Sequence, residues 1–374
     1  MRVLIVTYNY LTGFGGGVYG ARAYINAFAD LYDDVTLLFP ARTGAESLPE
    51  IDPKVRCIGI VDRASRVQKA TRLLFRGILH RFERPFLRLL EEEKFGMIVF
   101  QNSKCSSRII RTARSSGART VVLHDNYEWE YTRDNTPLLL RPLLLPAVVR
   151  TEREAVREAD LNLALTSDDL RMLSARYGKG MKGRMALLGT FEYRNTAEAV
   201  PSCAVSPVFA ITGNLGVRQT LDSLFPWLYQ YLPLLREAVK GAQVIVAGKN
   251  PRPELKQRLR ESGVELVDTP SDMNAVLARA KYYVCPVNRG GGVKLRVMDG
   301  LRAGLPALVH RVSARGYEAL EGISVFVYDD PNSFRESLQK MLACSGTPQE
   351  RQQAYYAQFS FEAGVERLRT ILDN

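Results

Sequence analysis

The sequence predicts an α/β protein built from two doubly wound parallel sheets. Short apolar runs alternate with amphipathic stretches along most of the chain, which is the pattern of repeated β-α-β units. A polar segment interrupts this alternation near the middle of the chain, and the alternation then starts again. Because 374 residues exceed one ordinary domain, two domains of roughly 150–190 residues are expected.

The first domain is predicted over residues 1–191. Its strands are expected in the apolar runs RVLIVTY, VTLLFP, VRCIGIV, MIVFQN, RTVVLHD, LNLALTS and MALLGT. Helical patterns lie between most of these runs, so the strands should pair in parallel with helices on both faces. Residues 192–207, EYRNTAEAVPSCAVSP, carry two prolines and no steady period, and are interpreted as a linker.

The second domain is predicted over residues 208–350. Its strands are expected in VFAITGN, AQVIVAGK, VELVDT, KYYVCPVN, PALVHR and SVFVYDD. The remaining tail has a helical pattern. In open α/β sheets, ligands bind at the carboxyl ends of the strands, and two such sheets can line a shared cleft. A substrate pocket between the two domains is therefore expected.

Net charge, cysteine spacing and histidine count indicate which partners and which cellular compartment to expect. The formal net charge of +11 suits nucleic acid, an anionic membrane surface or phosphorylated substrates, and the absence of a nucleic-acid-binding motif makes nucleic acid the weakest of these. The five cysteines are scattered and never form C-x-x-C, which is typical of buried thiols in a reducing compartment. With no apolar leader apparent, a cytoplasmic location is expected. Three histidines and no D-x-D pair predict no metal site.

The first glycine-rich stretch is FGGGVYG, in which Gly15, Gly17 and Gly20 fit G-x-G-x-x-G. A nicotinamide site is disfavoured, because seven residues separate Tyr8 from Gly16 and no carboxylate ends the VTLLFP run. A loop that only lets a helix pack closely is one alternative. The favoured interpretation is a loop whose amides near Gly16 and Gly17 face a phosphate or sugar, with a helix opening at about Val18.

The second glycine-rich stretch, RGGGVKLRVMDGLRAGLPALVH, is the more informative. A helix is predicted from about Val293 to Ala303, opened by Gly290–Gly292, so that its free N–H groups suit a diphosphate. Lys294 is expected in the first turn, where it adds a full charge. Asp299 could accept two hydrogen bonds from a ribose diol. An ordinary amphipathic helix with a solvated Lys and Asp remains the alternative.

This segment resembles the GT-B retaining glycosyltransferases of the large family-four type. Their pattern K-(I/V)-(L/M)-E-A-x-A-x-G-x-P is matched by RVMDGLRAGLP, with Arg296 for the Lys and Asp299 for the Glu. Many members carry a second Glu eight residues earlier, and Gly291 stands there in this chain, which leaves the donor sugar open. Other branches have G-x-G-(T/S)-(R/K) instead, and GGGVK is similar to it.

Further segments carry the same resemblance in the same order. RTVVLHDNYEWEY resembles the strand that ends in a cleft histidine, here His124, and VFAITGNL resembles the strand and glycine turn that open the donor domain, with Gly213. SARGYEAL resembles the loop facing the donor sugar, with Arg315 in place of a Glu. FSFEAGVERLRTIL resembles the terminal helix that crosses back to the first domain, about residues 355–374 here.

The resemblance implies transfer of a sugar, with retention, from a nucleotide-diphosphate donor to a glycan or lipid-linked acceptor hydroxyl, in bacterial cell-surface polysaccharide or glycolipid assembly. UDP is favoured over GDP, and neither cofactor nor metal is implied. The catalytic residues are expected to be His124, Lys294 and Asp299. The donor-binding residues are expected to be Gly16, Gly17, Gly213, Arg218, Lys249, Gly291, Gly292, Val293, Arg296 and Arg315. Alternatives from other classes are a non-catalytic nucleotide-sugar binder, a GT-B epimerase and, less favoured, an NAD-dependent enzyme.

One basic stretch, residues 63–88, suggests membrane contact. Its cations recur at helical spacing on one expected stripe, and its apolar residues gather on another. The stripe of cations comprises Arg63, Arg66, Lys69, Arg72 and Arg76. A basic face beside a wide apolar one suits peripheral binding to an anionic bilayer, here the inner membrane face, although a packed domain helix with solvated arginines would show a similar pattern.

Overall fold

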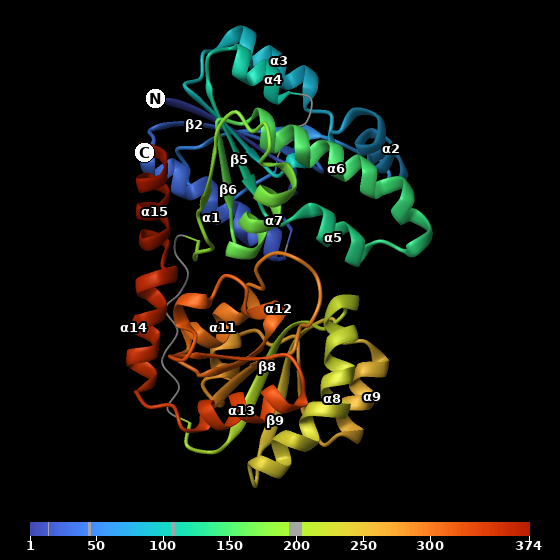
Figure 1. Ribbon diagram of the computed structural model, residues 1–374, viewed down its shortest axis with the longest axis vertical. Helices are drawn as coiled ribbons and strands as arrows, with labels where there is room; N and C mark the ends of the chain where they lie inside the picture. Colours follow the sequence, from blue (N-terminus) through green and yellow to red (C-terminus); the bar gives the residue numbers. More distant parts are fainter. Residues whose placement is uncertain (14, 44–45, 106–108, 194–203) are drawn as a thin grey trace. The chain divides into compact units, whose positions relative to one another are not determined.

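The computed structural model describes residues 1–13, 15–43, 46–105, 109–193 and 204–374 (Figure 1). The chain divides into two compact units, Met1–Thr196 with Phe359–Asn374, and Ala197–Gln358. Most of the predicted linker, residues 194–203, lies outside the described residues. Each unit is therefore described by itself.

The first unit contains a seven-stranded sheet in the order β3-β2-β1-β4-β5-β6-β7. All neighbouring strands run parallel. Its strands are β1 (Arg2–Thr7), β2 (Asp34–Ala41), β3 (Arg56–Val61), β4 (Met97–Gln101), β5 (Arg119–His124), β6 (Leu161–Ala164) and β7 (Arg184–Leu187). The order reverses between β1 and β4, which creates a crevice outside the carboxyl ends of these two strands.

The second unit repeats this arrangement with six parallel strands in the order β10-β9-β8-β11-β12-β13. Its strands are β8 (Val208–Asn214), β9 (Gln243–Lys249), β10 (Glu265–Asp268), β11 (Tyr282–Cys285), β12 (Ala307–His310) and β13 (Val325–Tyr328). The order reverses between β8 and β11. Every strand expected from an apolar run is present, and the predicted fold class, two Rossmann-like parallel sheets, is confirmed.

The helices of the first unit cover both faces of its sheet. They are α1 (Gly16–Leu31), α2 (Arg66–Arg76), α3 (Glu83–Glu92), α4 (Ile110–Ser115), α5 (Glu128–Asn135), α6 (Arg141–Glu158) and α7 (Ser167–Tyr177), with single turns η1 (Ser103–Cys105) and η2 (Leu138–Leu140). One core cluster joins α3, α4 and α6 to the central strands through residues such as Phe86, Ile110 and Ala155. Helix α1 packs against the last helix of the chain.

The helices of the second unit are α8 (Arg218–Ala238), α9 (Pro253–Glu261), α10 (Met273–Leu277), α11 (Arg296–Arg302), α12 (Arg311–Ala314), α13 (Pro331–Leu342) and α14 (Pro348–Phe359), with the turn η3 (Glu318–Leu320) (Figure 1). Trp227 of α8, Leu255 of α9 and Phe334 of α13 are buried in one cluster with the strands. Helix α11 packs on β8, β11 and β12. Its Gly300 allows this approach, because a Cβ there would lie 2.3 Å from the Tyr283 ring.

The predicted terminal helix is two helices. Helix α14 ends at Phe359, and Ser360 caps α15 (Phe361–Asp373) by accepting a hydrogen bond from the amide of Ala363. Helix α15 belongs to the first unit, where Arg119 and Arg184 donate to its terminal carbonyls of Leu372 and Ile371. These cations satisfy carbonyls that have no partner within the helix and complement its dipole.

The expectation of one continuous helical stripe over residues 63–88 is wrong. Gly77, with φ of 67°, ends α2, and α3 begins at Glu83. Arg63 precedes α2, whereas Lys69 and Arg72 contact Tyr10 and Asp62 within the unit. The break arises because a left-handed glycine cap terminates a helix whatever its charge pattern. Ile78 and Phe82, two apolar residues of this stretch, are core residues after the break.

No helix among the described residues is long and apolar enough to cross a bilayer.

The contact of α15 with the first unit depends on Gly364. A Cβ at this position would lie 2.1 Å from Cγ of the buried Phe191 ring. We expect Gly364→Ala to lower the free energy of unfolding by about 1–3 kcal/mol, because the ring must move in a packed environment. Urea denaturation measures this change. The control is Gly20→Ala within α1, where the nearest atom is 3.4 Å away on a side chain and the substitution should be neutral or stabilising by up to ~1 kcal/mol. Equal stabilities of the two variants would contradict the prediction.

Candidate functional site

In the second unit, the predicted site residues gather at the carboxyl ends of β8 and β11, where the strand order reverses. The glycine turn Gly213–Gly216 begins in the last residues of β8, and the glycine-rich loop of residues 286–295 follows β11. This is the crevice that binds ligands in doubly wound sheets.

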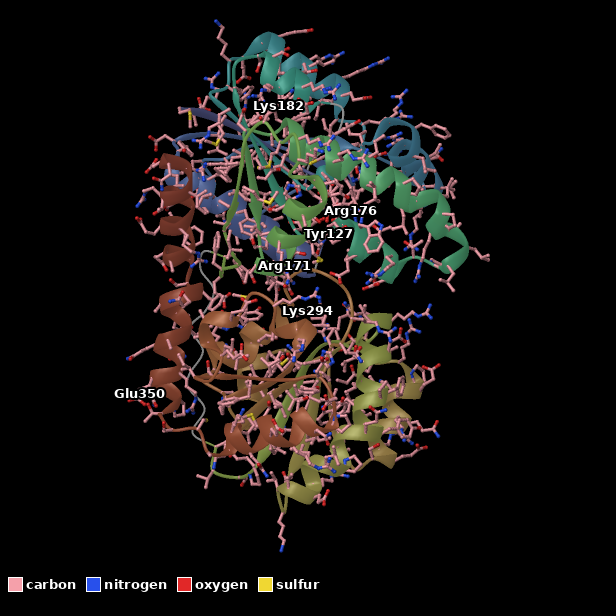
Figure 2. All side chains as sticks on the ribbon, viewed as in Figure 1. Tyr127, Arg171, Arg176, Lys182, Lys294 and Glu350 are labelled. Atoms are coloured by element: carbon pink, nitrogen blue, oxygen red, sulfur yellow. The ribbon has the colours of Figure 1, made fainter. Side chains whose placement is uncertain are left out.

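Lys294 organises the glycine-rich loop from inside. It is buried, with an exposed fraction of 7%, and its ammonium group donates to the carbonyl oxygens of Gly290, Gly291 and Gly292 at 2.8, 2.7 and 3.1 Å. Figure 2 labels Lys294 on the stretch that leads into α11. Gly290 and Gly292 have φ of 83° and 69°, a backbone conformation that side-chain-bearing residues avoid.

The orientation of these carbonyls determines where the amides point. Because C=O and N–H of one peptide unit point in opposite directions, the N–H groups of Gly291, Gly292 and Val293 face away from Lys294. Within the described part of the chain, these three amides have no hydrogen-bond acceptor. Successive outward N–H groups in a turn with left-handed residues form a concave anion-binding surface.

The helix begins later than expected. It was predicted from about Val293, but α11 begins at Arg296, and Lys294 lies before its first turn. The reason is that the three carbonyls ahead of the helix bond to the Lys294 ammonium instead of to helical amides. The expected diphosphate-binding amides are therefore those of a loop and not those of a helix terminus.

Arg296 lies over the glycine turn of β8. Its guanidinium donates to Thr220 Oγ1 at 3.1 Å and approaches the Thr212 carbonyl at 3.5 Å. A Cβ at Gly213 would be 2.5 Å from Arg296 Nη1, so a side chain there would displace the guanidinium from this position. The structure thus brings together Arg296 and Gly213, two residues that are 83 positions apart in the sequence.

Asp299 is held by a polar cluster that sequence inspection missed. Its Oδ2 accepts from Thr212 Oγ1 at 2.9 Å, and its Oδ1 lies 3.6 Å from the guanidinium of Arg302. Tyr283 completes the cluster, because its hydroxyl lies 2.7 Å from Thr212 Oγ1 and donates to the Arg296 carbonyl. The side chain of Asp299 remains 31% exposed, so its carboxylate is both fixed in direction and open to a ligand.

Three further predicted residues, Arg218, Lys249 and Arg315, lie near the carboxyl ends of neighbouring strands. Arg218 opens α8 with a side chain 88% exposed and pairs with Asp222 at 3.5 Å. Lys249 is exposed at the carboxyl end of β9. Arg315 follows α12 in a loop whose Tyr317 hydroxyl donates to the Lys294 carbonyl, which ties this loop to the glycine-rich loop.

In the first unit, the glycine-rich loop opens α1. The helix begins at Gly16, two residues before the expected Val18, and its preceding residue, Gly15, has φ of 153° and provides no side-chain cap. Gly16 and Gly17 are exposed. Their first-turn amides are therefore accessible at the positive end of a sixteen-residue helix.

His124 ends β5 and is buried, with an exposed fraction of 1%. Its Nε2 lies 2.9 Å from Asn162 Oδ1 on β6, so Nε2 carries the proton and donates. Nδ1 is then an acceptor, and it has no partner among the described residues. Burial lowers the pKa of His124, which keeps the ring neutral near pH 7.

A buried charged cluster beside His124 was not predicted. Glu128 receives hydrogen bonds from Asn102 at 2.5 Å and Asn126 at 3.0 Å, and it pairs with Lys104 at 2.5 Å.

Glu152 belongs to the same cluster. It accepts a hydrogen bond from the Glu128 amide on one oxygen and from the Tyr177 hydroxyl on the other. The sequence offered a weak indication in the acidic run after His124, but none for Lys104.

The acids of this cluster do not all ionise together. Burial, followed by the charge of Glu128, raises the pKa of Asp125 to about 7 and that of Glu152 to about 8. Asp125 follows His124 directly, accepts from Gln101 at 3.3 Å and adjoins the Tyr8 hydroxyl. A carboxyl group that titrates near neutral pH at a strand end can accept or donate a proton.

Within the described residues, no group of His, Cys, Asp and Glu side chains is arranged to hold a metal ion.

The raised pKa of Glu152 predicts a pH-dependent stability. Between its ordinary value of 4.5 and about 8, the folded protein binds a proton that the unfolded chain does not, so the free energy of unfolding falls as pH rises through this window. Glu152→Gln mimics the neutral form, so the free energy of unfolding of this variant should decrease less over the same pH range, by an amount on the order of 3 kcal/mol. The measurement is Tm between pH 5 and 8.5, with Glu366→Gln, an exposed pair partner of Arg369, as control. Parallel curves for wild type and Glu152→Gln would show that this carboxyl is ionised in the folded state.

Comparisons with known proteins concern the fold and the second unit. Residues 206–344, which cover most of the second unit, match the family model described as Glycosyl transferases group 1. No sequence among curated proteins matches the chain.

Solved structures resemble the whole chain. The lipopolysaccharide outer core galactosyltransferase WaaB is 11% identical, with all of this chain and 99% of that one covered and a TM-score of 0.67. The sucrose-phosphate synthase from Thermosynechococcus elongatus is 13% identical, with 100% and 98% covered and a TM-score of 0.71. WaaG, a glycosyltransferase of lipopolysaccharide biosynthesis, is 15% identical, with 100% and 95% covered and a TM-score of 0.58. At such identities the likeness establishes the fold. The chain thus has the GT-B fold, and its residues 206–344 are similar to the group 1 glycosyltransferases.

Proposed function

We propose that this protein transfers a glycosyl group from a nucleotide-diphosphate sugar to an acceptor hydroxyl, with retention of anomeric configuration. The observation that carries the proposal is the loop of outward amides at Gly291–Val293, flanked by Arg296 and Asp299 at the strand-order reversal of a group 1 domain. Nucleotide release from UDP- and GDP-sugars, in the presence of candidate acceptors, is the direct test.

The donor's diphosphate leaves as an anion, so catalysis requires positioning and charge stabilisation. The amides of Gly291–Val293 supply fixed donors, and Arg296 supplies a positive charge beside Gly213. Lys294 holds the loop in its binding conformation, and its charge lies directly behind the amides. These groups are expected to take the place of a bridging metal.

Asp299 would accept hydrogen bonds from the ribose diol, since its carboxylate is anchored by Thr212 and its side chain is 31% exposed. Lys249 and Arg315 would approach the nucleotide and the sugar from neighbouring strand ends, and Arg218 from the start of α8. UDP is proposed as the nucleotide in preference to GDP. Lipopolysaccharide glycosyltransferases among the structural neighbours support an acceptor in bacterial cell-surface glycan or glycolipid assembly.

The first unit would supply acceptor chemistry. His124 and Asp125 stand at the end of β5, and a group with a pKa of about 7 can take up the proton that the acceptor hydroxyl loses. The exposed amides of Gly16 and Gly17 provide a second anion-binding turn for a donor phosphate.

A non-catalytic nucleotide-sugar binder is the second candidate. Gly291 favours this candidate, because many glycosyltransferases of the family-four type carry a carboxylate at this position. The two functions differ in turnover: a binder would hold UDP or GDP and release none from the corresponding sugars.

Peripheral contact with an anionic membrane surface is also proposed, for a cytoplasmic protein at the inner membrane face. Val67 and Phe75 on α2 are 75% and 74% exposed, and Leu139 of η2 is 93% exposed. Helices α2 and α6 are neighbours, because Arg150 on α6 reaches the Leu73 carbonyl on α2 at 3.5 Å. The exposed Arg63 and Arg66 add positive charge beside these apolar residues, a combination suited to lying in the bilayer interface.

Asp299→Ala should weaken UDP binding at least tenfold without unfolding the protein, because each hydrogen bond to a charged group contributes about 1.5–3 kcal/mol. Isothermal titration with UDP and GDP measures the loss. Glu265→Ala is the control, since this carboxylate pairs with Arg279 at the amino end of β10. Unchanged UDP affinity in Asp299→Ala would remove this residue from the nucleotide site.

Charge reversal at Arg63 and Arg66 should abolish co-sedimentation with phosphatidylglycerol vesicles and leave UDP binding intact, because each basic residue near an anionic surface contributes about 1 kcal/mol. Arg72 is left unchanged because it pairs with the buried Asp62. Reversal of Lys94 and Lys179, two exposed lysines outside α2 and η2, is the matched control. Sedimentation that does not change with salt concentration, or that also occurs with vesicles of phosphatidylcholine alone, would contradict membrane binding through charge.

A further inference from the structure

A second cationic cluster lies at the carboxyl edge of the first unit's sheet, centred on the ring of Tyr10. The Lys69 ammonium lies 4.6 Å from the ring centroid and donates to the Tyr10 hydroxyl at 2.6 Å. The Arg42 guanidinium lies 5.7 Å from the same centroid. Because both distances share one centroid, the two charges are no more than about 10 Å apart.

The residues come from three segments that the fold gathers. Tyr10 follows β1, Arg42 follows β2, and Lys69 lies in α2, which follows β3. These strands are neighbours in the sheet, and all their carboxyl ends lie at one edge. Two exposed cations are added by Arg63, which precedes α2, and Arg66, which is the first residue of α2.

These cations are not neutralised in the part of the chain that the structure describes. Arg42, Lys69, Arg63 and Arg66 form no salt bridge there. The carboxylate of Asp62, whose carbonyl accepts from Tyr10, is already bound, because His80 and Arg72 contact its Oδ2 at 2.9 and 2.7 Å. Although burial opposes ionisation, these two partners lower the pKa of Asp62. Glu46 uses one oxygen to accept the backbone amides of Arg42 and Thr43.

The tyrosine is fixed in place, so the cluster is built and not a chance arrangement of long side chains. The Tyr10 hydroxyl donates to the Asp62 carbonyl at 3.2 Å, and the buried His80 ring packs edge-on against the Tyr10 ring at 5.4 Å. The tyrosine orients both cations, Lys69 through the hydrogen bond to its hydroxyl and Arg42 through electrostatic attraction to the ring. Preoriented cations lose little conformational freedom when they bind an anion.

We propose that Arg42, Lys69 and Tyr10 form an acceptor-side subsite for a phosphate or diphosphate group. The proposal rests on the proposed glycosyltransferase function, which it extends by assigning the acceptor a phosphorylated class. A lone carboxylate would be satisfied by one guanidinium. Two separate cations on one ring, with two more beside them, suit a group that carries two or more negative charges and several acceptor oxygens.

The subsite is tested by titrating inorganic pyrophosphate into the full chain in the presence of saturating UDP, which occupies the glycine-rich loop of the second unit. The test variant is Arg42→Gln with Lys69→Gln. The control is Lys240→Gln with Arg258→Gln, which also removes one lysine and one arginine, and which removes the contact of Arg258 with the Tyr229 ring at 3.7 Å. We expect at least a tenfold loss of pyrophosphate affinity in the test variant, none in the control, and equal UDP affinity in all three proteins.

Pyrophosphate affinity that is equal in the test variant and wild type, or pyrophosphate that does not bind wild type, overturns the subsite. Failure of wild type to bind any nucleotide instead refutes the proposed function, and the pyrophosphate comparison, made then without UDP, still decides on the subsite. Geranyl diphosphate identifies the source of the phosphate. Tighter binding than pyrophosphate indicates a lipid-linked acceptor, equal binding indicates a soluble phosphorylated one, and both should be lost in the test variant.

Discussion

The bonding of one buried ammonium group to three consecutive glycine carbonyls determines the geometry of the second unit's site. Lys294 cannot be left unpaired in the interior, and Gly290–Gly292 are the residues whose backbone can curve around it. This arrangement delays the start of α11 to Arg296 and turns the following amides outward. Arg296 and Asp299 then occupy fixed positions over β8. The expected charge of the site is present, but it is buried behind the amides and not extended toward the ligand.

The first unit uses buried charge differently. Around Glu128, one lysine and three acids share a small volume, and Lys104 is the one cation that bonds directly to these acids within the described residues. Burial disfavours the charged form of Lys104, but Glu128 outweighs it and raises the pKa of Lys104. Burial, followed by the charge of Glu128, raises the pKa values of Asp125 and Glu152, and the single lysine does not offset this. Burial and the nearby charge thus leave a group able to exchange a proton near neutral pH at the end of β5.

Much of the fold could be predicted from the sequence, because apolar strands in a buried parallel sheet leave a direct trace in residue type. The first and last residues of the helices were harder to predict than the strands. The left-handed cap at Gly77 and the loop before Arg296 depend on backbone dihedrals and on a lysine bonded to carbonyls, neither of which appears in hydrophobic periodicity. For the site, pattern resemblance located Arg296 and Asp299, which the structure places beside Gly213 and Thr212. Thr212, Tyr283 and Lys104 were missed, since each acts through a partner distant in sequence.

The placement of α15 has a consequence for how the protein is made. The first unit is discontinuous, and Phe359–Asn374 join it only after the whole second unit has been translated. While the ribosome synthesises residues 197–358, the surface around Phe191 that receives Gly364 has no covering helix. Domains generally fold as units during synthesis, so the second unit can complete its fold first, although it is encoded second. The nascent first unit therefore exposes this apolar surface until α15 has been synthesised.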